Sequence, residues 1–386
     1  MNTKEKDKKY IANTYSRFDV ALASGKGSTL IDENGKEYID FGSGIGVTAF
    51  GICDEEWKAA VNEQLDRLQH VSNLYFTAPC AELAKLLCEK TGMSKVFFGN
   101  SGAEANEGAI KFARKYSSDK YGDGRSTIIT LVNSFHGRTI ATLSATGQEV
   151  FHKDFGPFVD GFKYCEANNC EQLAEMATPD VCAIMFECVQ GEGGVLNLSP
   201  EFISEIEKIA VEKDILMICD EVQTGNGRTG RYFAYENFGI KPDIVTTAKG
   251  LGGGLPIGAV LFNEKFENVV TPSSHGSTFG GNPIAAAGAV SIVKRIDDNL
   301  LAEVRKKSEY IKNYLTGVKG VKGISGMGLM LGVETEKPAA EIAKACLENG
   351  LLVLTAKTKV RLLPALNITY GELDKGLEIL KEAIEK

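Results

Sequence analysis

The sequence predicts an α/β fold, in which a large domain with a mostly parallel central sheet precedes a smaller α+β domain. Six short apolar runs alternate with helical stretches between residues 95 and 262, as in sheets built from strand–helix–strand units. The last part of the chain alternates apolar and helical stretches a second time. We therefore expect an N-terminal segment, 1–50, that packs with the small domain, a large domain over 51–285 and the small domain over 286–386.

The large domain is expected to begin with helices and continue with the sheet. Residues 28–40 favour a hairpin around Asn34-Gly35. Residues 55–70 and 79–91 have the spacing of amphipathic helices. The predicted strands of the sheet are 95–98, 126–132, 182–188, 215–219, 244–247 and 258–262.

The C-terminal part repeats this alternation on a smaller scale. Residues 283–316 and 338–348 are expected to be helical, and the apolar runs GLMLGVE, LLVLTA and VRLLPAL lie between helices. A last helix begins near residue 370, where Thr369 and Glu372 have the spacing of a capping box. The glycine-rich GISGMG at 323–328 is predicted to be a join within this domain.

Composition excludes several classes of protein. The chain has 386 residues and a net charge of −8, so it lacks the basic character of a nucleic-acid-binding protein. No run approaches the ~18 apolar residues of a membrane span. Nine cysteines without a CxxC motif indicate a cytoplasmic protein with reduced thiols, and four histidines without ligand spacing indicate no metal site.

Small, polar or ionisable residues follow five of the predicted strands. GNSGAEAN follows Phe98, NSFHGRT follows Val132, ECVQGEGG closes the third strand, DEVQTGNGRTG follows Cys219 and AKGLGGG follows Thr247. In open α/β sheets, ligands bind outside the carboxyl ends of the strands. We therefore expect these five segments to meet in one cleft.

Lys249 closes the fifth of these strands. A lysine withdrawn from water loses its proton more easily, and a neutral amine forms a Schiff base with an aldehyde. By itself the pattern also fits a lysine whose ammonium reaches solvent. The coincidence of five polar strand ends favours the reactive lysine.

Two other strand ends offer an anion site and a carboxylate. Ser101 and Glu104 have the spacing of a capping box, and the helix start at Gly102 and Ala103 suits a phosphate, although a plain capped helix would have the same signature. Asp220 ends the apolar run ILMICD and needs a metal, a backbone donor, a cationic heterocycle or a turn to cap. The metal of a P-loop enzyme is excluded because GxxxxGK[ST] is absent.

Two further motifs are set aside. GNGRTG at 225–230 matches the GxGxxG of dinucleotide-binding folds, but RYFAYENFG, not an apolar helix, follows it. In addition, Asp243 precedes the next strand instead of ending it. A serine hydrolase is unsupported because no GxSxG is present.

Pyridoxal phosphate is the cofactor that needs these residue types together. Its aldehyde takes a lysine, its phosphate an anion cradle, its ring nitrogen a carboxylate and its aromatic face a flat side chain. Lys249, residues 101–103, Asp220 and Phe135 supply these four groups. A carboxylate beside the ring nitrogen keeps that nitrogen protonated, so the ring withdraws electrons.

The chain also resembles a known family. NSGAEANEGAIK, SFHGRT, FECVQGEGGV, ICDEVQTGNGRTG, DIVTTAKGLGGGLPIGAV and HGSTFGGNP resemble the motifs of class III pyridoxal-phosphate-dependent aminotransferases, above all those acting on acetylornithine. The resemblance extends from about residue 15 to 366. It implies the type I aminotransferase fold and a homodimer with its sites at the subunit interface. AFGICDE at 49–55 and Cys188 depart from the family pattern near the expected substrate entrance.

The resemblance implies roles for individual residues. Lys249 would bind the cofactor aldehyde and move the proton, Asp220 would face the ring nitrogen, and Arg138 would bind the carboxylate distant from the reacting amine. Arg361 would bind the α-carboxylate of glutamate or 2-oxoglutarate, and Glu187 would pair with it when that carboxylate is absent. The remaining implied cofactor contacts are Ser101, Gly102, Ala103, Phe135, Glu221, Val222, Gln223 and Thr278, the last from the partner subunit; the remaining substrate contacts are Ser277 and Tyr15.

The implied reaction transfers the δ-amino group of N2-acetylornithine to 2-oxoglutarate, which becomes glutamate. Ornithine, succinylornithine, succinyldiaminopimelate or 4-aminobutyrate would fit much the same set of residues. A racemase or aminomutase, or a cofactor-binding protein without catalysis, remains as an alternative. A racemase or aminomutase would not need 2-oxoglutarate, and the implied pair of Glu187 and Arg361 argues against it. A cofactor-binding protein without catalysis would not need both Arg138 and Arg361, and both are present.

Overall fold

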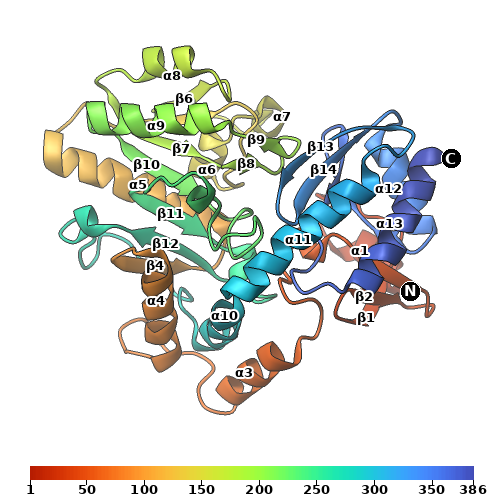
Figure 1. The fold of residues 1–386 in the computed structure, drawn as a ribbon. Helices are drawn as coiled ribbons and strands as arrows, with labels where there is room; N and C mark the ends of the chain where they lie inside the picture. The colour runs from red at the N-terminus through yellow and green to blue at the C-terminus, as the bar shows by residue number, and fades with distance from the viewer.

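The structure, a computed structural model, describes residues 1–386 as two lobes (Figure 1). The larger lobe surrounds the central sheet, and both chain termini lie in the smaller lobe. None of the helices is both long enough and apolar enough to cross a bilayer.

The larger lobe contains a seven-stranded sheet with the order β4-β12-β11-β10-β7-β5-β6. All strands run in one direction except β12, which is antiparallel to both neighbours. Only residues 248–257 join β11 to β12, and this link is too short for the helical crossover that parallel strands need. The strands are β4 (Lys95–Gly99), β5 (Thr127–Leu131), β6 (Phe162–Cys165), β7 (Val181–Phe186), β10 (Leu216–Asp220), β11 (Ile244–Thr247) and β12 (Gly258–Phe262).

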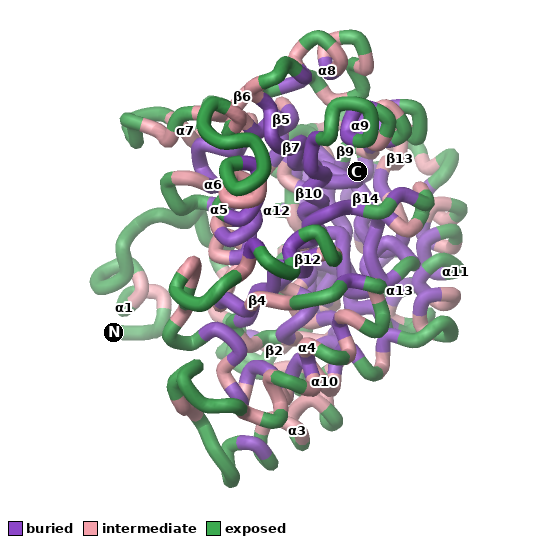
Figure 2. The backbone as a smooth tube through the Cα atoms, turned by 90° about the vertical axis from the view of Figure 1, so that its left-hand side faces the viewer, coloured by how far each residue is buried: buried purple, intermediate pink, exposed green.

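Alternating side chains of β10 explain how helices cover both faces of the sheet. Leu216 and Ile218 lie in the core that includes α5, whereas Met217 and Cys219 lie in the core that includes α9. Figure 2 shows buried residues concentrated along these strands. The helices of this lobe are α3 (Glu55–Leu65), α4 (Ala78–Thr91), α5 (Gly102–Tyr121), α6 (Ile140–Ala145), α7 (Glu149–His152), α8 (Cys170–Met176), α9 (Pro200–Lys213) and α10 (Pro283–Arg295).

The smaller lobe combines residues from both ends of the chain. Its antiparallel sheet has the order β13-β14-β17-β16, and a second sheet, β1-β2-β3-β15, joins the N-terminal strands to the C-terminal region. The strands are β1 (Leu22–Lys26), β2 (Thr29–Asp32), β3 (Glu37–Asp40), β13 (Val321–Met327), β14 (Met330–Thr335), β15 (Leu351–Leu352), β16 (Leu354–Ala356) and β17 (Lys359–Leu362). Its helices are α11 (Asp298–Leu315), α12 (Ala339–Glu348) and α13 (Tyr370–Glu385).

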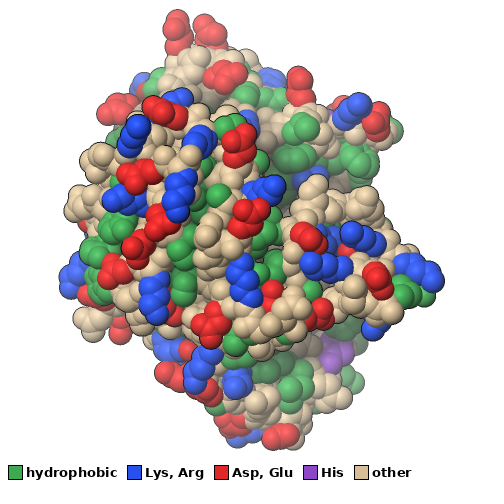
Figure 3. Space-filling model, turned by 90° about the vertical axis from the view of Figure 1, so that its right-hand side faces the viewer, with side chains coloured by type: hydrophobic (Ala, Val, Ile, Leu, Met, Phe, Trp, Pro, Cys, Tyr) green, Lys and Arg blue, Asp and Glu red, His purple; other side chains and the backbone are tan.

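Four short elements lie outside these groups. Helix α1 (Thr3–Tyr10) has no buried residue, α2 (Ser43–Gly46) is a single turn, and β8 (Val189–Gln190) forms a hairpin with β9 (Leu196–Asn197). Acidic and basic side chains are interspersed over the face drawn in Figure 3.

The α/β fold and its mostly parallel sheet are confirmed, with local corrections. The edge strand β6 was not predicted, and the stretch 283–316 is two helices, because Asp297 caps a new helix by accepting from the Leu300 N–H at 2.8 Å. GISGMG is not a join, because residues 321–327 pair with β14 as a strand. The three-part division of the chain stays a prediction, and its boundary at residue 285 falls inside α10.

Candidate active site

A cavity of about 410 Å³ lies where five strands of the central sheet end. Its wall contains segments that follow β4, β5, β7, β10 and β11, so the expected meeting of strand ends does occur. Ten of the predicted site residues line it: Ser101, Gly102, Ala103, Phe135, Arg138, Glu187, Asp220, Val222, Gln223 and Lys249.

Lys249 lies in the wall of this cavity, directly after β11. Its backbone has a φ of 45°, a left-handed conformation that lysine rarely adopts. Burial lowers the pKa of its ammonium, and the carboxylates of Asp220 and Glu192 offset part of this effect. The lysine is thus easier to deprotonate than one in water, as a nucleophilic amine requires.

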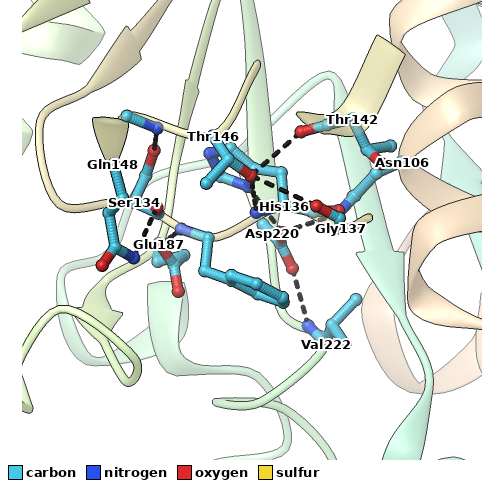
Figure 4. Close-up of polar contacts among 12 residues, drawn as sticks. Asn106, Ser134, His136, Gly137, Thr142, Thr146, Gln148, Glu187, Asp220 and Val222 are labelled. Carbon is cyan, nitrogen blue, oxygen red and sulfur yellow. Dashed lines mark hydrogen bonds and ion pairs between the residues drawn. The ribbon is translucent and has the colours of Figure 1, made fainter. Parts of the chain in front are cut away.

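Asp220 is held by three donors at the end of β10. Its Oδ1 accepts from the Val222 N–H at 3.0 Å, and its Oδ2 accepts from Asn106 Nδ2 at 2.8 Å and lies 2.7 Å from His136 Nδ1 (Figure 4). Asn106 also donates to the backbone oxygen of His136 at 2.7 Å. Sequence reasoning missed Asn106 and His136, although both stand in the motifs NSGAEAN and FHGR.

The start of α5 forms one end of the cavity. Ser101 accepts from the Glu104 N–H at 3.1 Å, as its N-cap role predicts, and the first N–H groups of a helix have no partner within the helix. The expected capping box is incomplete, because Glu104 accepts from the N–H of Asn100 and not from that of Ser101. A Cβ on Gly102 would lie 2.6 Å from Val222 Cγ1, so only glycine fits there.

Arg361 enters the site from β17, and its acidic partner differs from the expected one. Its Nη1 lies 2.5 Å from Glu192 Oε1, and Gln223 bonds to both side chains at 3.2 Å. Glu187 forms no pair with Arg361; its Oε2 accepts from the Phe135 N–H at 3.0 Å. The hairpin of β8 and β9 carries Glu192 to β17, a placement that spacing along the chain does not reveal.

The electrostatic surroundings of the two glutamates differ as well as their positions. Burial and the neighbouring Asp220 carboxylate raise the pKa of Glu187 well above its usual range. Burial also acts on Glu192, but the Arg361 guanidinium outweighs it and lowers the pKa of Glu192. The surroundings therefore disfavour the carboxylate form of Glu187 and favour that of Glu192.

Four predicted residues lie outside the cavity wall, in addition to Arg361. Glu221 is buried behind it, where it accepts from the Tyr235 N–H at 2.9 Å and from Thr224 Oγ1 at 2.5 Å. Burial raises the pKa of Glu221 to about 7. The others are Ser277, which accepts from Asn100 Nδ2 at 3.2 Å, the exposed Thr278, and Tyr15, which is 70% exposed.

Comparisons with known proteins agree with this geometry. Residues 10–384 match the family described as aminotransferase class-III. The chain is 50% identical to an acetylornithine aminotransferase of Haemophilus ducreyi, over 99% of this chain and 98% of that one, and 46% identical to that of Aquifex aeolicus, over 97% and 100%.

Solved structures are similar over nearly the whole chain. The N-acetylornithine aminotransferase of Stenotrophomonas maltophilia is 36% identical, with a TM-score of 0.83 over 96% of both chains. An ornithine aminotransferase of Toxoplasma gondii, with PLP at partial occupancy in its active site, is 30% identical, with a TM-score of 0.94 over 99% of this chain and 93% of that one. By its cavity, its fold and these matches, the chain belongs to the class III aminotransferases.

Proposed function

We propose that this protein uses pyridoxal phosphate to transfer the δ-amino group of N2-acetylornithine to 2-oxoglutarate. The products are N-acetylglutamate 5-semialdehyde and glutamate, in a step of arginine biosynthesis. The observation that carries the proposal is Lys249, a desolvated amine in the wall of a cavity that also contains a fixed carboxylate and a helix N-terminus. The acetylornithine donor is supported by the names of the relatives at 40–50% identity.

The residues of the cavity fit pyridoxal phosphate. The N–H groups at Gly102 and Ala103, at the start of α5, would hold its phosphate, because they have no partner within the helix. Asp220 would face the ring nitrogen, and Phe135 and Gln223 would contact the ring. When bound, this cofactor supplies an aldehyde that carries the amino group and a ring that withdraws electrons.

Lys249 acts as the base. In its neutral form, Nζ takes a proton from the δ-carbon of the donor and later returns a proton to the carbon that receives the amino group. The three donors on Asp220 keep its carboxylate in one orientation, so it holds a proton on the ring nitrogen without rearrangement.

Two arginines would distinguish the substrates. Arg138 lies in the cavity wall outside every ion pair of the chain, so its donors are available for the carboxylate of acetylornithine. Arg361 would meet no carboxylate beside a reacting δ-amine, and Glu192 neutralises it. The α-carboxylate of 2-oxoglutarate would take the place of Glu192 in the second half of the reaction.

We infer further that the protein acts as a homodimer in the cytoplasm. Leu74, Tyr75, Phe76 and Phe279 expose large apolar side chains, and hydrogen bonds from Asn73 bring their two segments together beside Thr278. In a dimer, Thr278 would reach the phosphate in the site of the partner subunit. Asn73 Nδ2 anchors the loop that contains Thr278, because it donates to the backbone oxygens of Ser277 and Gly280 at 2.9 Å. The nine free cysteines agree with a reducing compartment.

Ornithine is the second candidate donor, because the similarity to the Toxoplasma ornithine aminotransferase has a TM-score of 0.94. Both donors present a δ-amine, and they differ in the acetyl group on the α-nitrogen. Discrimination of such a group is worth only ~1–3 kcal/mol in a pocket without a dedicated contact.

The test is a stopped-flow comparison of ω-amines with the cofactor-saturated protein. Acetylornithine alone is expected to remove the visible absorbance of the bound cofactor, and 2-oxoglutarate is expected to restore it. Ornithine, succinylornithine, succinyldiaminopimelate and 4-aminobutyrate are compared by kcat/KM. Lys249→Ala is the inactive control. Lack of any absorbance change with all five amines would refute the proposal.

A further inference from the structure

We propose that Phe151 is a positioning residue for Arg138, and that it holds the guanidinium by its face so that the edge stays free for a substrate carboxylate. The inference rests on the proposed function, because it needs Arg138 to bind that carboxylate. Phe151 belongs to α7 and does not line the cavity itself.

Arg138, Phe151 and Phe135 pack against one another beside the cavity. Arg138 Cζ lies 4.0 Å from the centre of the Phe151 ring and 5.5 Å from that of Phe135. The two rings meet edge to face, with centres 5.7 Å apart and planes at 80°. Phe135 and Arg138 both line the cavity, so Phe151 packs against two residues of the cavity wall.

A ring suits this task better than an acid does. A guanidinium carries its five N–H donors in the plane, while its face attracts an aromatic ring. An acidic partner would occupy the donors that the substrate needs, as Glu192 does for Arg361. The ring restricts the long arginine side chain and leaves its donors free, which lowers the entropy lost on binding.

The position of Phe151 is fixed by hydrogen bonds on both sides of it. Gln148 Nε2 donates to the backbone oxygen of Ser134 at 3.0 Å, and the Gly147 N–H donates to Ser134 Oγ at 3.0 Å (Figure 4). His152 Nε2 lies 2.8 Å from the backbone oxygen of Leu143. Ser134 directly precedes Phe135, so the ring and the cavity wall are parts of one anchored unit.

The experiment measures carboxylate binding without turnover. Glutarate, a five-carbon dicarboxylate without an amino or keto group, is titrated calorimetrically into the cofactor-saturated protein. Phe151→Leu is expected to raise its Kd about fivefold to tenfold, the value of one cation–π contact. Phe151→Tyr keeps the ring and is expected to stay within about twofold. Val150→Ala, a change at the exposed neighbour, is expected to bind as the parent does.

Kinetics separate positioning from simple packing. Phe151→Leu is expected to raise KM for acetylornithine by the same factor with little change in kcat, and to leave kcat/KM for 1,4-diaminobutane, which has no carboxylate, unchanged. Unaltered glutarate binding in Phe151→Leu would overturn the inference. An equal loss of kcat/KM for 1,4-diaminobutane would also overturn it. So would a Kd for glutarate that rises as much in Phe151→Tyr as in Phe151→Leu. If no ω-amine reacts with the parent protein, the proposed function fails, while the glutarate titration still decides the role of Phe151.

Discussion

At the scale of single residues, two glutamates five positions apart have different partners. Glu187 accepts from a backbone N–H, and burial beside Asp220 raises its pKa, whereas Glu192 pairs with Arg361, which outweighs burial and lowers its pKa. A buried arginine that loses its only anionic partner is strongly destabilised. The charge that balances Arg361 therefore belongs to Glu192.

Amide substitutions distinguish the two glutamates. Glu187→Gln is expected to keep kcat within about threefold, because Glu187 forms no ion pair and accepts one hydrogen bond, which an amide oxygen also accepts. Glu192→Gln is expected to raise KM for acetylornithine about tenfold and to leave or lower KM for 2-oxoglutarate, because Arg361 loses its counter-ion. Steady-state kinetics with each substrate varied measures both effects. A hundredfold loss of kcat in Glu187→Gln would contradict this prediction, because it would show that the carboxyl group itself is required.

Glu221 makes stability depend on pH. Its folded-state pKa of about 7 is above the usual value of 4.5, so the folded state holds a proton that the unfolded state has released. This contribution is fully present below pH 4.5 and is lost as pH rises to 7, a decrease of about 3 kcal/mol. The free energy of unfolding is measured with urea at pH 5 and at pH 8. Glu221→Gln is expected to remove this contribution from the decrease between the two pH values. Glu212→Gln, at an exposed position of α9, is the matched control, and identical curves for Glu221→Gln and the parent would refute the prediction.

At the scale of elements, the start of α5 contacts the loop after β10 at the end of the cavity where we propose that the cofactor phosphate binds. Gly102 and Val222 come from segments far apart in the sequence, and an added Cβ on Gly102 would lie 2.6 Å from Val222 Cγ1. Any real Cβ would force one of the two segments to move. The glycine is required by the neighbouring valine and not by its own backbone angles, since its φ is not in the left-handed region.

A double-mutant cycle tests this contact. Gly102→Ala is expected to weaken pyridoxal phosphate binding about tenfold or more, because overpacking costs ~1–3 kcal/mol. Val222→Ala removes the opposing methyl groups and is expected to restore most of that loss in the double variant. Binding is measured by absorbance titration of the cofactor-free protein. Gly371→Ala, where an added Cβ meets nothing within 4 Å, is the control, and strict additivity would exclude the contact as the cause.

At the scale of the whole molecule, the smaller lobe reaches the cavity through Arg361, which donates to Gln223 in the cavity wall. Arg361 comes from the smaller lobe, and Arg228 links the lobes by donating from Nη1 to the backbone oxygens of Leu329, at 3.1 Å, and Pro364. Thr278 lies outside the cavity of its own chain. A second copy that covers the exposed apolar loop would complete the site.

Disrupting that surface is expected to reduce activity in parallel with dimerisation. Phe76 is fully exposed in the single chain, and Phe76→Asp is expected to weaken self-association at least tenfold, because a charge would be buried in the interface. Sedimentation velocity and activity are measured over a dilution series. Val211→Asp, at an exposed apolar position on α9, is expected to change neither. A fully active monomer of Phe76→Asp would contradict the proposed role of the partner subunit.

The sequence by itself determined the fold and half of the residues that line the cavity. Strands buried on both faces are continuous apolar runs, so their carboxyl ends, and with them Asp220 and Lys249, can be located along the chain. The sequence does not predict the edge strand β6, because only Cys165 of its four residues is buried and the apolar signal is weak. GISGMG was misread because a strand rich in glycine has the composition of a loop.

Only the tertiary structure decided which groups meet across distant segments. The motif FECVQGEGG contains two glutamates, and the β8–β9 hairpin brings Glu192, not Glu187, to Arg361. The donors on Asp220 come from α5 and from the segment after β5, and the stack of Phe151 on Arg138 depends on how α7 is anchored. Local propensity is encoded in neighbouring residues. Two side chains far apart in the sequence, in contrast, come into contact only through the tertiary fold of the backbone between them.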